Sequence, residues 1–227
     1  MLSIVDLIDT GTMTRELAAY SLAAIGNGAS FMIGALPGGA GKTTVMGALL
    51  NFVSSDIPLV AADSGAVIAA GLTGQTHRRC YICHEIGDGP YYAYLWGEPL
   101  RRYFELPTAG HMLATNLHAN TYEQSRAQVC DENSVPLVAF CRMNLLYFLA
   151  VERQPHGVQR RIVSVWEGDG KSEHRQVFDG KNPAKPFGSR LVSGAALQTA
   201  TRIVERLMSA GVRQIHEVRA ILTAEEP

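Results

Sequence analysis

The sequence has 227 residues, of which 47% are hydrophobic and 18% charged. This length suits one ordinary globular domain with a sizeable core. Twenty basic and 21 acidic side chains leave a net charge of −1, which argues against nucleic-acid binding through bulk electrostatics. The longest purely apolar run, Leu145 to Val151, has seven residues, against the ~20 needed to span a bilayer. No signal peptide is visible, so we expect a cytoplasmic protein without a membrane span.

Strands and helices are predicted to alternate in the first half of the chain. Thr14 is a candidate N-cap for a helix in which Ala18, Leu22 and Ile25 repeat with helical spacing. A second predicted helix covers residues 43–52. Short apolar runs that fit buried strands are Phe31–Ala35, Ile57–Ala62, Tyr91–Trp96 and His111–Leu117. This alternation favours an α/β fold with a mostly parallel sheet flanked by helices.

The second half of the chain is predicted to begin with a β-hairpin, Asn144–Glu152 and Gln159–Glu167. A polar stretch follows, with one strand expected near Val177, and two amphipathic helices close the chain. We therefore expect a main domain over residues 1–190, with the hairpin near 144–167. A C-terminal helical segment over 191–227 would pack on or beside it.

The strongest motif lies between a predicted strand and a predicted helix. It matches the phosphate-binding pattern G-x-x-x-x-G-K-[ST] except at the first position, which is Leu36. Glycines let backbone N–H groups curl around phosphate oxygens, and the helix N-terminus adds positive charge. Lys42 would reach the β- and γ-phosphates of ATP, Thr43 would bind Mg²⁺, and Thr44 would contact the α-phosphate. The predicted nucleotide-binding residues are Pro37, Gly38, Gly39, Ala40, Gly41, Lys42, Thr43 and Thr44.

Two acidic residues are candidates for the carboxylate that hydrolysis requires beside the γ-phosphate. Glu98 follows the apolar run 91–96 and a glycine, but it could equally be a surface residue that caps the helix before Pro99. Asp63 ends another predicted strand and could hold a Mg²⁺-bound water. Its alternative is a turn aspartate that bonds its own backbone.

Two histidines, His111 and His118, flank the predicted strand 111–117. A single histidine is more often structural than functional. A pair around one strand, together with Thr115 and Asn116, makes a functional role as probable as a structural one.

Together these motifs resemble the C-terminal RecA-like domain of the secretion-superfamily ATPases, the motors of type II and type IV secretion, pili and archaella. Residues 36–44 resemble the Walker A motif, and Asp63 falls at the acidic box. Residues 95–98 resemble Walker B, and 110–119 the histidine box. The resemblance implies a RecA-like P-loop fold, Glu98 as the catalytic glutamate, Asp63 as a second acidic group and His118 as a γ-phosphate sensor. It also implies ATP and Mg²⁺ as cofactors and a hexameric ring peripheral to the inner membrane.

The sequence departs from this family in two ways. The P-loop begins 35 residues from Met1, whereas the family usually has a preceding domain that supplies arginines. The usual Gly-Glu-x-Arg-Asp is Gly97-Glu98-Pro99-Leu100-Arg101 here. An arginine finger contributes ~10³–10⁵ in rate, so we expect slow hydrolysis unless a partner supplies the missing domain and arginines.

Four cysteines, Cys80, Cys83, Cys130 and Cys141, are too few for a disulfide scaffold. Zinc binding by the four is chemically possible, but buried reduced thiols are favoured. The sequence thus predicts an ATPase. Two alternatives are a nucleotide-binding regulatory or assembly subunit with little hydrolysis, and a P-loop kinase.

Overall fold

The computed structural model describes residues 2–36, 38–73, 77–155, 157–182 and 188–224. Its centre is an eight-stranded sheet in the order β2-β3-β5-β1-β6-β7-β8, with β4 paired to β3. The pairs from β2 to β6 are parallel, and β7 and β8 are antiparallel to their neighbours. The strands are β1 (Phe31–Gly34), β2 (Leu59–Ala61), β3 (Cys80–Ile86), β4 (Tyr94–Leu95), β5 (Met112–Leu117), β6 (Leu145–Gln154), β7 (Gly157–Glu167) and β8 (Arg175–Asp179).

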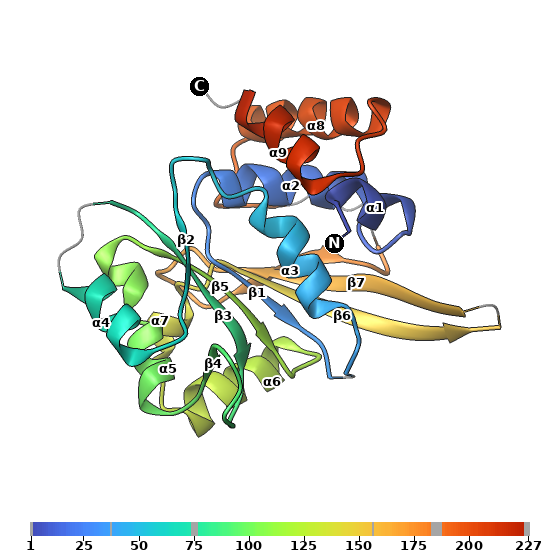
Figure 1. Cartoon of the computed structure of the whole chain (residues 1–227). Coiled ribbons are helices and arrows are strands. Elements are labelled where there is room, and N and C mark those ends of the chain that lie inside the picture. Colours follow the sequence, from blue (N-terminus) through green and yellow to red (C-terminus); the bar gives the residue numbers. More distant parts are fainter. Residues whose placement is uncertain (1, 37, 74–76, 156, 183–187, 225–227) are drawn as a thin grey trace.

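Helices cover both faces of the sheet (Figure 1). Side chains alternate along β1, so that Phe31 and Ile33 enter one hydrophobic cluster and Met32 enters the other. The first cluster includes residues of α1 (Ile4–Asp9), α2 (Arg15–Gly26), α3 (Lys42–Leu50), α8 (Gly194–Ser209) and α9 (Ile215–Ala224). The second includes residues of α4 (Gly65–Leu72), α5 (Glu98–Tyr103), α6 (Tyr122–Arg126) and α7 (Leu137–Phe140), beside short helical turns at Leu106–Ala109 and Ala127–Glu132.

Side-chain caps begin most of the longer helices. Thr14 accepts a hydrogen bond from Leu17 N at 3.1 Å, as expected for the predicted N-cap of α2. Ser3 and Asp6 form a capping box at α1. By contrast, α3 begins at Gly41 with no side-chain cap. The first N–H groups of α3 therefore remain available to a ligand.

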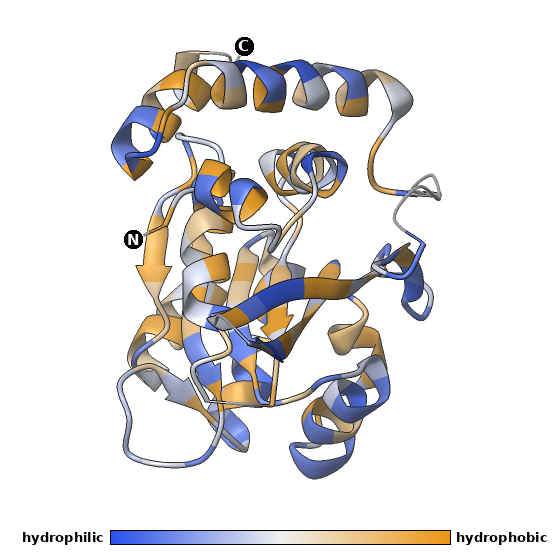
Figure 2. Ribbon diagram, turned by 90° about the vertical axis from the view of Figure 1, so that its right-hand side faces the viewer, coloured by the Kyte–Doolittle hydropathy of each residue, from blue (hydrophilic) through white to orange (hydrophobic). Residues whose placement is uncertain are grey.

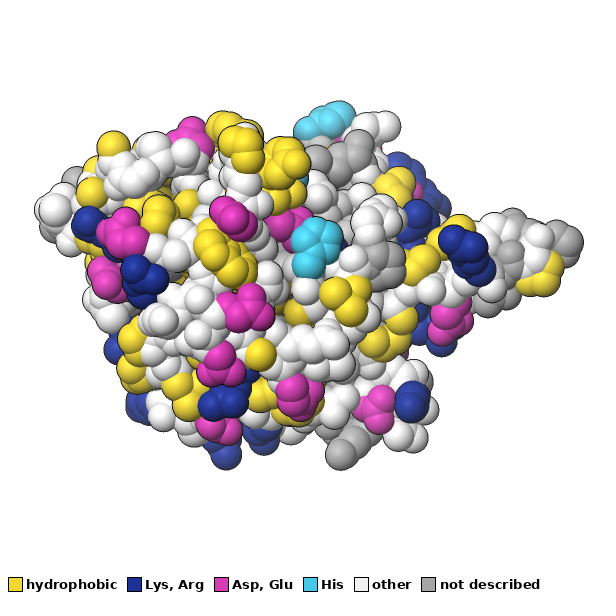
Figure 3. All heavy atoms as spheres, turned by 90° about the horizontal axis from the view of Figure 1, so that it is seen from below, with side chains coloured by type: hydrophobic (Ala, Val, Ile, Leu, Met, Phe, Trp, Pro, Cys, Tyr) yellow, Lys and Arg dark blue, Asp and Glu magenta, His cyan; other side chains and the backbone are white. Residues whose placement is uncertain are grey.

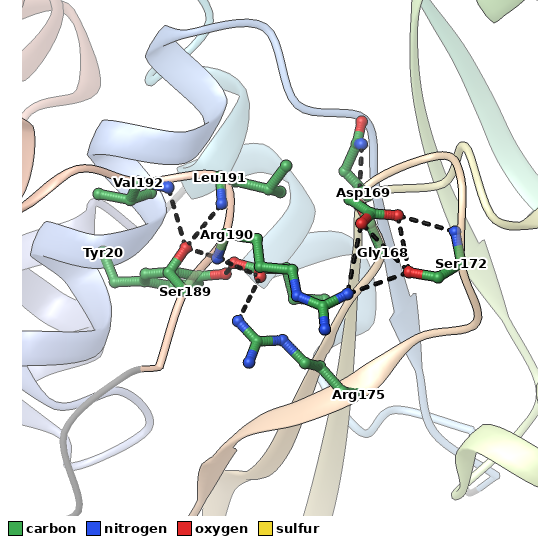
Figure 4. Close-up of polar contacts among 11 residues, drawn as sticks. Tyr20, Gly168, Asp169, Ser172, Arg175, Ser189, Arg190, Leu191 and Val192 are labelled. Atoms are coloured by element: carbon green, nitrogen blue, oxygen red, sulfur yellow. Dashed lines mark hydrogen bonds and ion pairs between the residues drawn. The ribbon is translucent and has the colours of Figure 1, made fainter.

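The segment before α8 is tied to the sheet by hydrogen bonds to a buried carboxylate, Glu167, the last residue of β7. Figure 4 shows its partners Tyr20, Ser189 and Arg190 gathered at this place. Glu167 accepts hydrogen bonds from Tyr20 Oη at 2.7 Å, from Arg190 N at 2.7 Å and from the Ser189 hydroxyl. Arg175 Nη2 lies 3.3 Å away. Because Ser189 and Arg190 precede α8, these bonds hold α8 near α2, against which it packs (Figure 2).

The structure confirms the expected mixed α/β fold with its mostly parallel sheet, and the hairpin is formed by β6 and β7. One strand prediction is largely wrong, because the run 91–96 contributes only β4. Tyr91 and Tyr92 are exposed, and Ala93 has a left-handed φ of 53°. The strand that takes this place in the sheet is β3, which was not predicted. No helix of the described residues is long and apolar enough to cross a membrane.

Candidate functional site

The carboxyl ends of β1, β5 and β3 meet at one edge of the sheet. The register places Gly34 beside Leu117, and Leu117 beside Ile86. Ala35, which begins the glycine-rich loop, His118 and Glu85 are therefore brought together from three different strands. Figure 3 shows this edge from below, where acidic, basic and apolar side chains are interspersed and the hairpin projects to one side.

The backbone of the glycine-rich loop takes conformations that favour glycine at two positions. Gly39 and Gly41 adopt left-handed φ values of 73° and 96°, which other residues adopt only with strain. A side chain on Gly38 would meet no atom within 4 Å, so this part of the loop is open. Leu36 N donates to Asn120 Oδ1 at 2.7 Å, which ties the start of the loop to the segment after β5. Pro37 lies outside the described residues.

Lys42 is buried at the base of this loop. Its Nζ lies 3.3 Å from Glu85 Oε1 and donates to Ala35 O at 3.2 Å. The two charged side chains are only 8% and 6% exposed. A buried ion pair depends on both partners, because removal of one leaves an uncompensated charge. Glu85 Oε1 accepts no hydrogen bond of good geometry among the described residues.

His118 joins the pair from the end of β5. Its Nδ1 lies 3.3 Å from Lys42 Nζ, and its Nε2 lies 3.6 Å from Glu85 Oε1. An ammonium only donates, so Nδ1 is the acceptor in the contact with Lys42, and Nε2 faces Glu85. The Leu36 carbonyl oxygen lies 3.4 Å from Nδ1 and is not its partner when Nδ1 accepts from Lys42. The side chain is 46% exposed and open to the pocket.

Arg160 of β7 lies across the other side of the loop. Its Nε and Nη2 donate to Gly39 O at 3.3 and 3.2 Å. A side chain on Gly41 would lie 3.1 Å from Arg160 Cδ, so the two are packed closely. The hairpin thus brings a second positive charge to the loop.

These groups line one pocket of about 560 Å³. Its lining includes the loop, Lys42, Thr43, Thr44, Glu85, His118 and Arg160. A glycine loop at an uncapped helix N-terminus, with two cations, is an anion-binding arrangement. The structure therefore brings together the expected loop, Lys42, Thr43, Thr44 and His118.

Magnesium prefers oxygen ligands. Thr43 is exposed and lines the pocket, and Glu85 contributes a buried oxygen without a hydrogen bond. These oxygens fit a magnesium ion with its bound waters. Asp63, the other expected metal group, does not line this pocket. It is exposed after β2, and its Oδ2 accepts from Tyr92 Oη at 3.3 Å.

Glu98, which the sequence predicted beside the γ-phosphate, does not line this pocket. Glu98 is exposed at the start of α5 and lines a different pocket, with Arg101, Arg102 and Glu105. The preceding Gly97 N donates to Asn133 Oδ1 at 2.6 Å, which ties this turn to the segment after the helical turn Ala127–Glu132. Glu85 is the carboxylate that meets the loop, because β3 rather than β4 neighbours β5.

Sequence reasoning missed Glu85 although a signal existed. The run Cys80-Tyr81-Ile82-Cys83 is apolar and rich in strand formers, and it ends in His84-Glu85. Both thiols are buried, and desolvation raises the pKa of each to about 12. The described residues contain no cluster of three or more side chains suited to a metal ion.

His111, at the other end of β5, has a structural role. Its Nδ1 accepts from Arg79 N at 3.2 Å, and its Nε2 lies 3.0 Å from Gly71 O. Both ring nitrogens are therefore used to connect β5 with β3 and α4. The two histidines that flank this strand have different surroundings, and only His118 reaches the pocket.

No protein-family model matches the sequence, and no curated protein matches it. Among solved structures, the chain is similar to proteins that are named as ATPases. The VirB11 ATPase of the Brucella suis type IV secretion system, in complex with sulphate, is 18% identical with a TM-score of 0.47, over 64% of this chain and 50% of that one.

The second is the ATPase DotB. The Legionella pneumophila protein is 12% identical with a TM-score of 0.49, over 93% of this chain and 61% of that one. The Yersinia pseudotuberculosis protein is 14% identical with a TM-score of 0.48, over 97% and 63%. The chain thus spans between half and just under two thirds of the length of these structures.

Proposed function

We propose that the chain binds Mg-ATP and hydrolyses it, as an ATPase of the secretion-superfamily type. The observation that carries this proposal is the buried pair of Lys42 and Glu85 beneath a left-handed glycine loop at the start of α3. Lys42 would supply a cation for phosphate and Glu85 a carboxylate for water, and their charged atoms lie 3.3 Å apart.

Binding would begin at the loop. The N–H groups of the loop and of the first turn of α3 would donate to the phosphate oxygens. Lys42 would then exchange its ion pair with Glu85 for the β- and γ-phosphates, which carry more negative charge. Arg160 would add charge on the outer side of the loop.

Hydrolysis would depend on the carboxylate that this exchange releases. Glu85 is buried beside the pocket, so it can accept a proton from water or orient water toward the terminal phosphate. His118 would stand beside this carboxylate, with its Nε2 3.6 Å from Glu85 Oε1. Thr43 and Glu85 would hold magnesium, which supplies Lewis-acid stabilisation of the phosphate charge when it is bound.

Several expectations from the family resemblance stay predictions. They are a hexameric ring, a place peripheral to the inner membrane in the cytoplasm, and a partner that supplies arginines and a further domain. The division of the chain at about residue 190 also stays a prediction. We give Glu98 and Asp63 no role in the chemistry, because neither lines the pocket that the loop forms.

The proposal is tested by titrating ATP with magnesium and measuring phosphate release, for wild type and Lys42→Ala. We expect Lys42→Ala to weaken ATP binding roughly tenfold to hundredfold, since it removes a charge-assisted contact to phosphate. Lys181→Ala, which removes an exposed lysine, is the matched control and should bind as wild type. Circular dichroism would confirm that both variants are folded.

Three outcomes would change the proposal. Equal ATP binding by wild type and Lys42→Ala would contradict it. Tight binding without phosphate release would favour the alternative of a regulatory or assembly subunit. Transfer of phosphate to an added acceptor, in place of release to water, would favour the kinase.

A further inference from the structure

A second pocket lies at the opposite edge of the sheet from the glycine loop. The parallel strands β1, β3, β5 and β6 begin at this edge, and β7, which is antiparallel to β6, ends here. The volume of the pocket is about 390 Å³. Its lining includes Ser30 before β1, Arg78 before β3, Arg142 before β6 and Lys171 after β7. The linings of the two pockets share no described residue, so this pocket is separate from the proposed ATP site.

Positive charge predominates in this lining. Arg78, Arg142 and Lys171 are cations, and Asp169 is the one carboxylate among the described residues that line the pocket. The Oδ2 atom of Asp169 lies 3.4 Å from Nη1 of Arg190, which is outside the lining, so this negative charge already has a partner (Figure 4). None of the three cations of the pocket forms an ion pair with the residues that the structure describes. The lining therefore carries an excess of positive charge.

Arg142 contributes donors that the protein itself does not use. Its side chain is half-buried, and within the described part of the chain its guanidinium makes no hydrogen bond. Its stem lies against the turn after β7, because a side chain built on Gly170 would be 3.6 Å from Arg142 Cγ. Arg78 donates from Nη2 to Gly28 O at 2.7 Å and keeps its other N–H groups. The oxygen atoms of an anion are the acceptors that such groups bind most strongly.

A buried hydroxyl adds a neutral donor to the lining. Ser30 is 2% exposed, and its Oγ accepts from Leu113 N at 3.0 Å. The hydroxyl hydrogen has no acceptor among the residues that the structure describes. Such a buried donor is normally bonded to protein, to water or to a ligand. Ser30 N also donates to Asn144 Oδ1, and Asn144 Nδ2 to Gly168 O, so the starts of β1 and β6 and the turn after β7 are joined.

We propose that this pocket is a second anion site, which binds a small molecule through a phosphate or carboxylate group. Arginine presents a planar fork of N–H groups that suits both oxyanions, and lysine adds a compact charge. The volume of the pocket falls within the range of small-molecule sites. The inference does not rest on the proposed function, because the glycine loop, Lys42 and Glu85 have no part in this pocket.

The test follows anion binding at each pocket separately. The ¹⁵N-labelled chain is titrated, without magnesium, with pyrophosphate as the phosphate probe and with citrate as the carboxylate probe. The backbone amides of Ser30 and Gly170 report on this pocket, and those of Gly39 and Gly41 report on the loop. One probe or both should shift the Ser30 and Gly170 signals to saturation. The tighter of the two identifies the oxyanion that the pocket prefers.

Two variants test the cations of the pocket. Arg142→Gln should weaken binding at the Ser30 and Gly170 signals roughly tenfold or more, and Lys171→Gln roughly threefold or more, since each removes a charge-assisted contact. Lys171 is exposed, so its replacement leaves the core intact. Binding at the loop signals should stay as in wild type for both variants.

Lys181→Gln is the matched control. Lys181 N donates to Asp179 Oδ1 at 2.9 Å, as Lys171 N does to Asp169 Oδ1, but Lys181 does not line the pocket. This variant should bind both probes as wild type does. Shifts confined to the loop signals, or no shift with either probe, would overturn the second site. So would wild-type affinity in both pocket variants, or an equal loss in Lys181→Gln. None of these results bears on Mg-ATP binding at the loop.

Discussion

Lys42 and Glu85 place opposite charges where water hardly reaches. Each side chain is less than 10% exposed, and their atoms lie 3.3 Å apart. Breaking such a pair by truncating one partner costs about 3–5 kcal/mol, because the other charge stays buried. Replacement of Glu85 by glutamine keeps the shape of the side chain, so it should cost less stability than truncation. A bound phosphate would replace the lost partner of Lys42, so the site is built to respond to an anion.

Another buried titratable residue, His174, predicts a dependence of stability on pH. Burial lowers the pKa of His174, whose Nε2 lies 2.6 Å from Met143 O. Below about 6.5, the ordinary histidine value, the unfolded chain binds a proton that the folded chain does not. The free energy of unfolding therefore falls as the pH drops through this value, by up to about 1.4 kcal/mol per unit.

Urea unfolding of wild type and His174→Phe at about pH 7 and about pH 5.5 measures this effect. The phenylalanine preserves ring contacts with Tyr122 and Phe140. We expect the variant to lose less stability between the two pH values, by about 1 kcal/mol. His216→Phe alters an exposed histidine of α9 and should lose as much as wild type. Equal losses in all three proteins would contradict the assignment.

At the scale of elements, the C-terminal helices depend on one polar cluster as well as on apolar packing. Glu167 gathers contacts from α2, from β8 and from the segment before α8. Asp169, nearby, accepts from Ser172 N at 2.8 Å and from Lys171 N at 2.9 Å, and these two bonds hold its pKa well below its usual range. Because Glu167 is buried and accepts from this many donors, it fixes how the chain enters α8.

Replacing Tyr20 by phenylalanine tests this anchor. The change removes the donor that lies 2.7 Å from Glu167 Oε2 and leaves a buried oxygen with one partner fewer. We expect a loss of about 1–3 kcal/mol in the free energy of unfolding by urea. Tyr92→Phe removes an exposed tyrosine hydroxyl that donates to Asp63 and should change stability by less than about 0.5 kcal/mol. Equal effects of the two changes would argue against the anchor.

Elements whose signals are local could be predicted from the sequence. The cap at Thr14, the strand before the loop and the helix after it follow from neighbouring residues, and the structure has all three. The strand β3 could not be placed in the same way. Its position between β2 and β5 depends on pairing across the sheet, which no pattern of neighbouring residues indicates.

At the scale of the whole molecule, the site is a consequence of strand order. Loop, histidine and carboxylate come from β1, β5 and β3, which are neighbours in the sheet but not in the sequence. A sequence motif indicates that a glutamate follows a strand, but not which strand lies beside the loop. For this reason the sequence could indicate that the loop, Lys42 and His118 lie together, but not that Glu85 lines this pocket and Glu98 lines another.

The most direct test of the account compares Glu85→Gln with Glu98→Gln in steady-state phosphate release from Mg-ATP, with ATP binding measured in parallel. Glu85→Gln should keep ATP binding and lose about 10²–10⁴-fold in turnover, the usual contribution of a positioned acid or base. Glu98→Gln, which alters an exposed side chain outside the pocket, should match wild type. Loss of turnover in Glu98→Gln with normal turnover in Glu85→Gln would contradict the site described here.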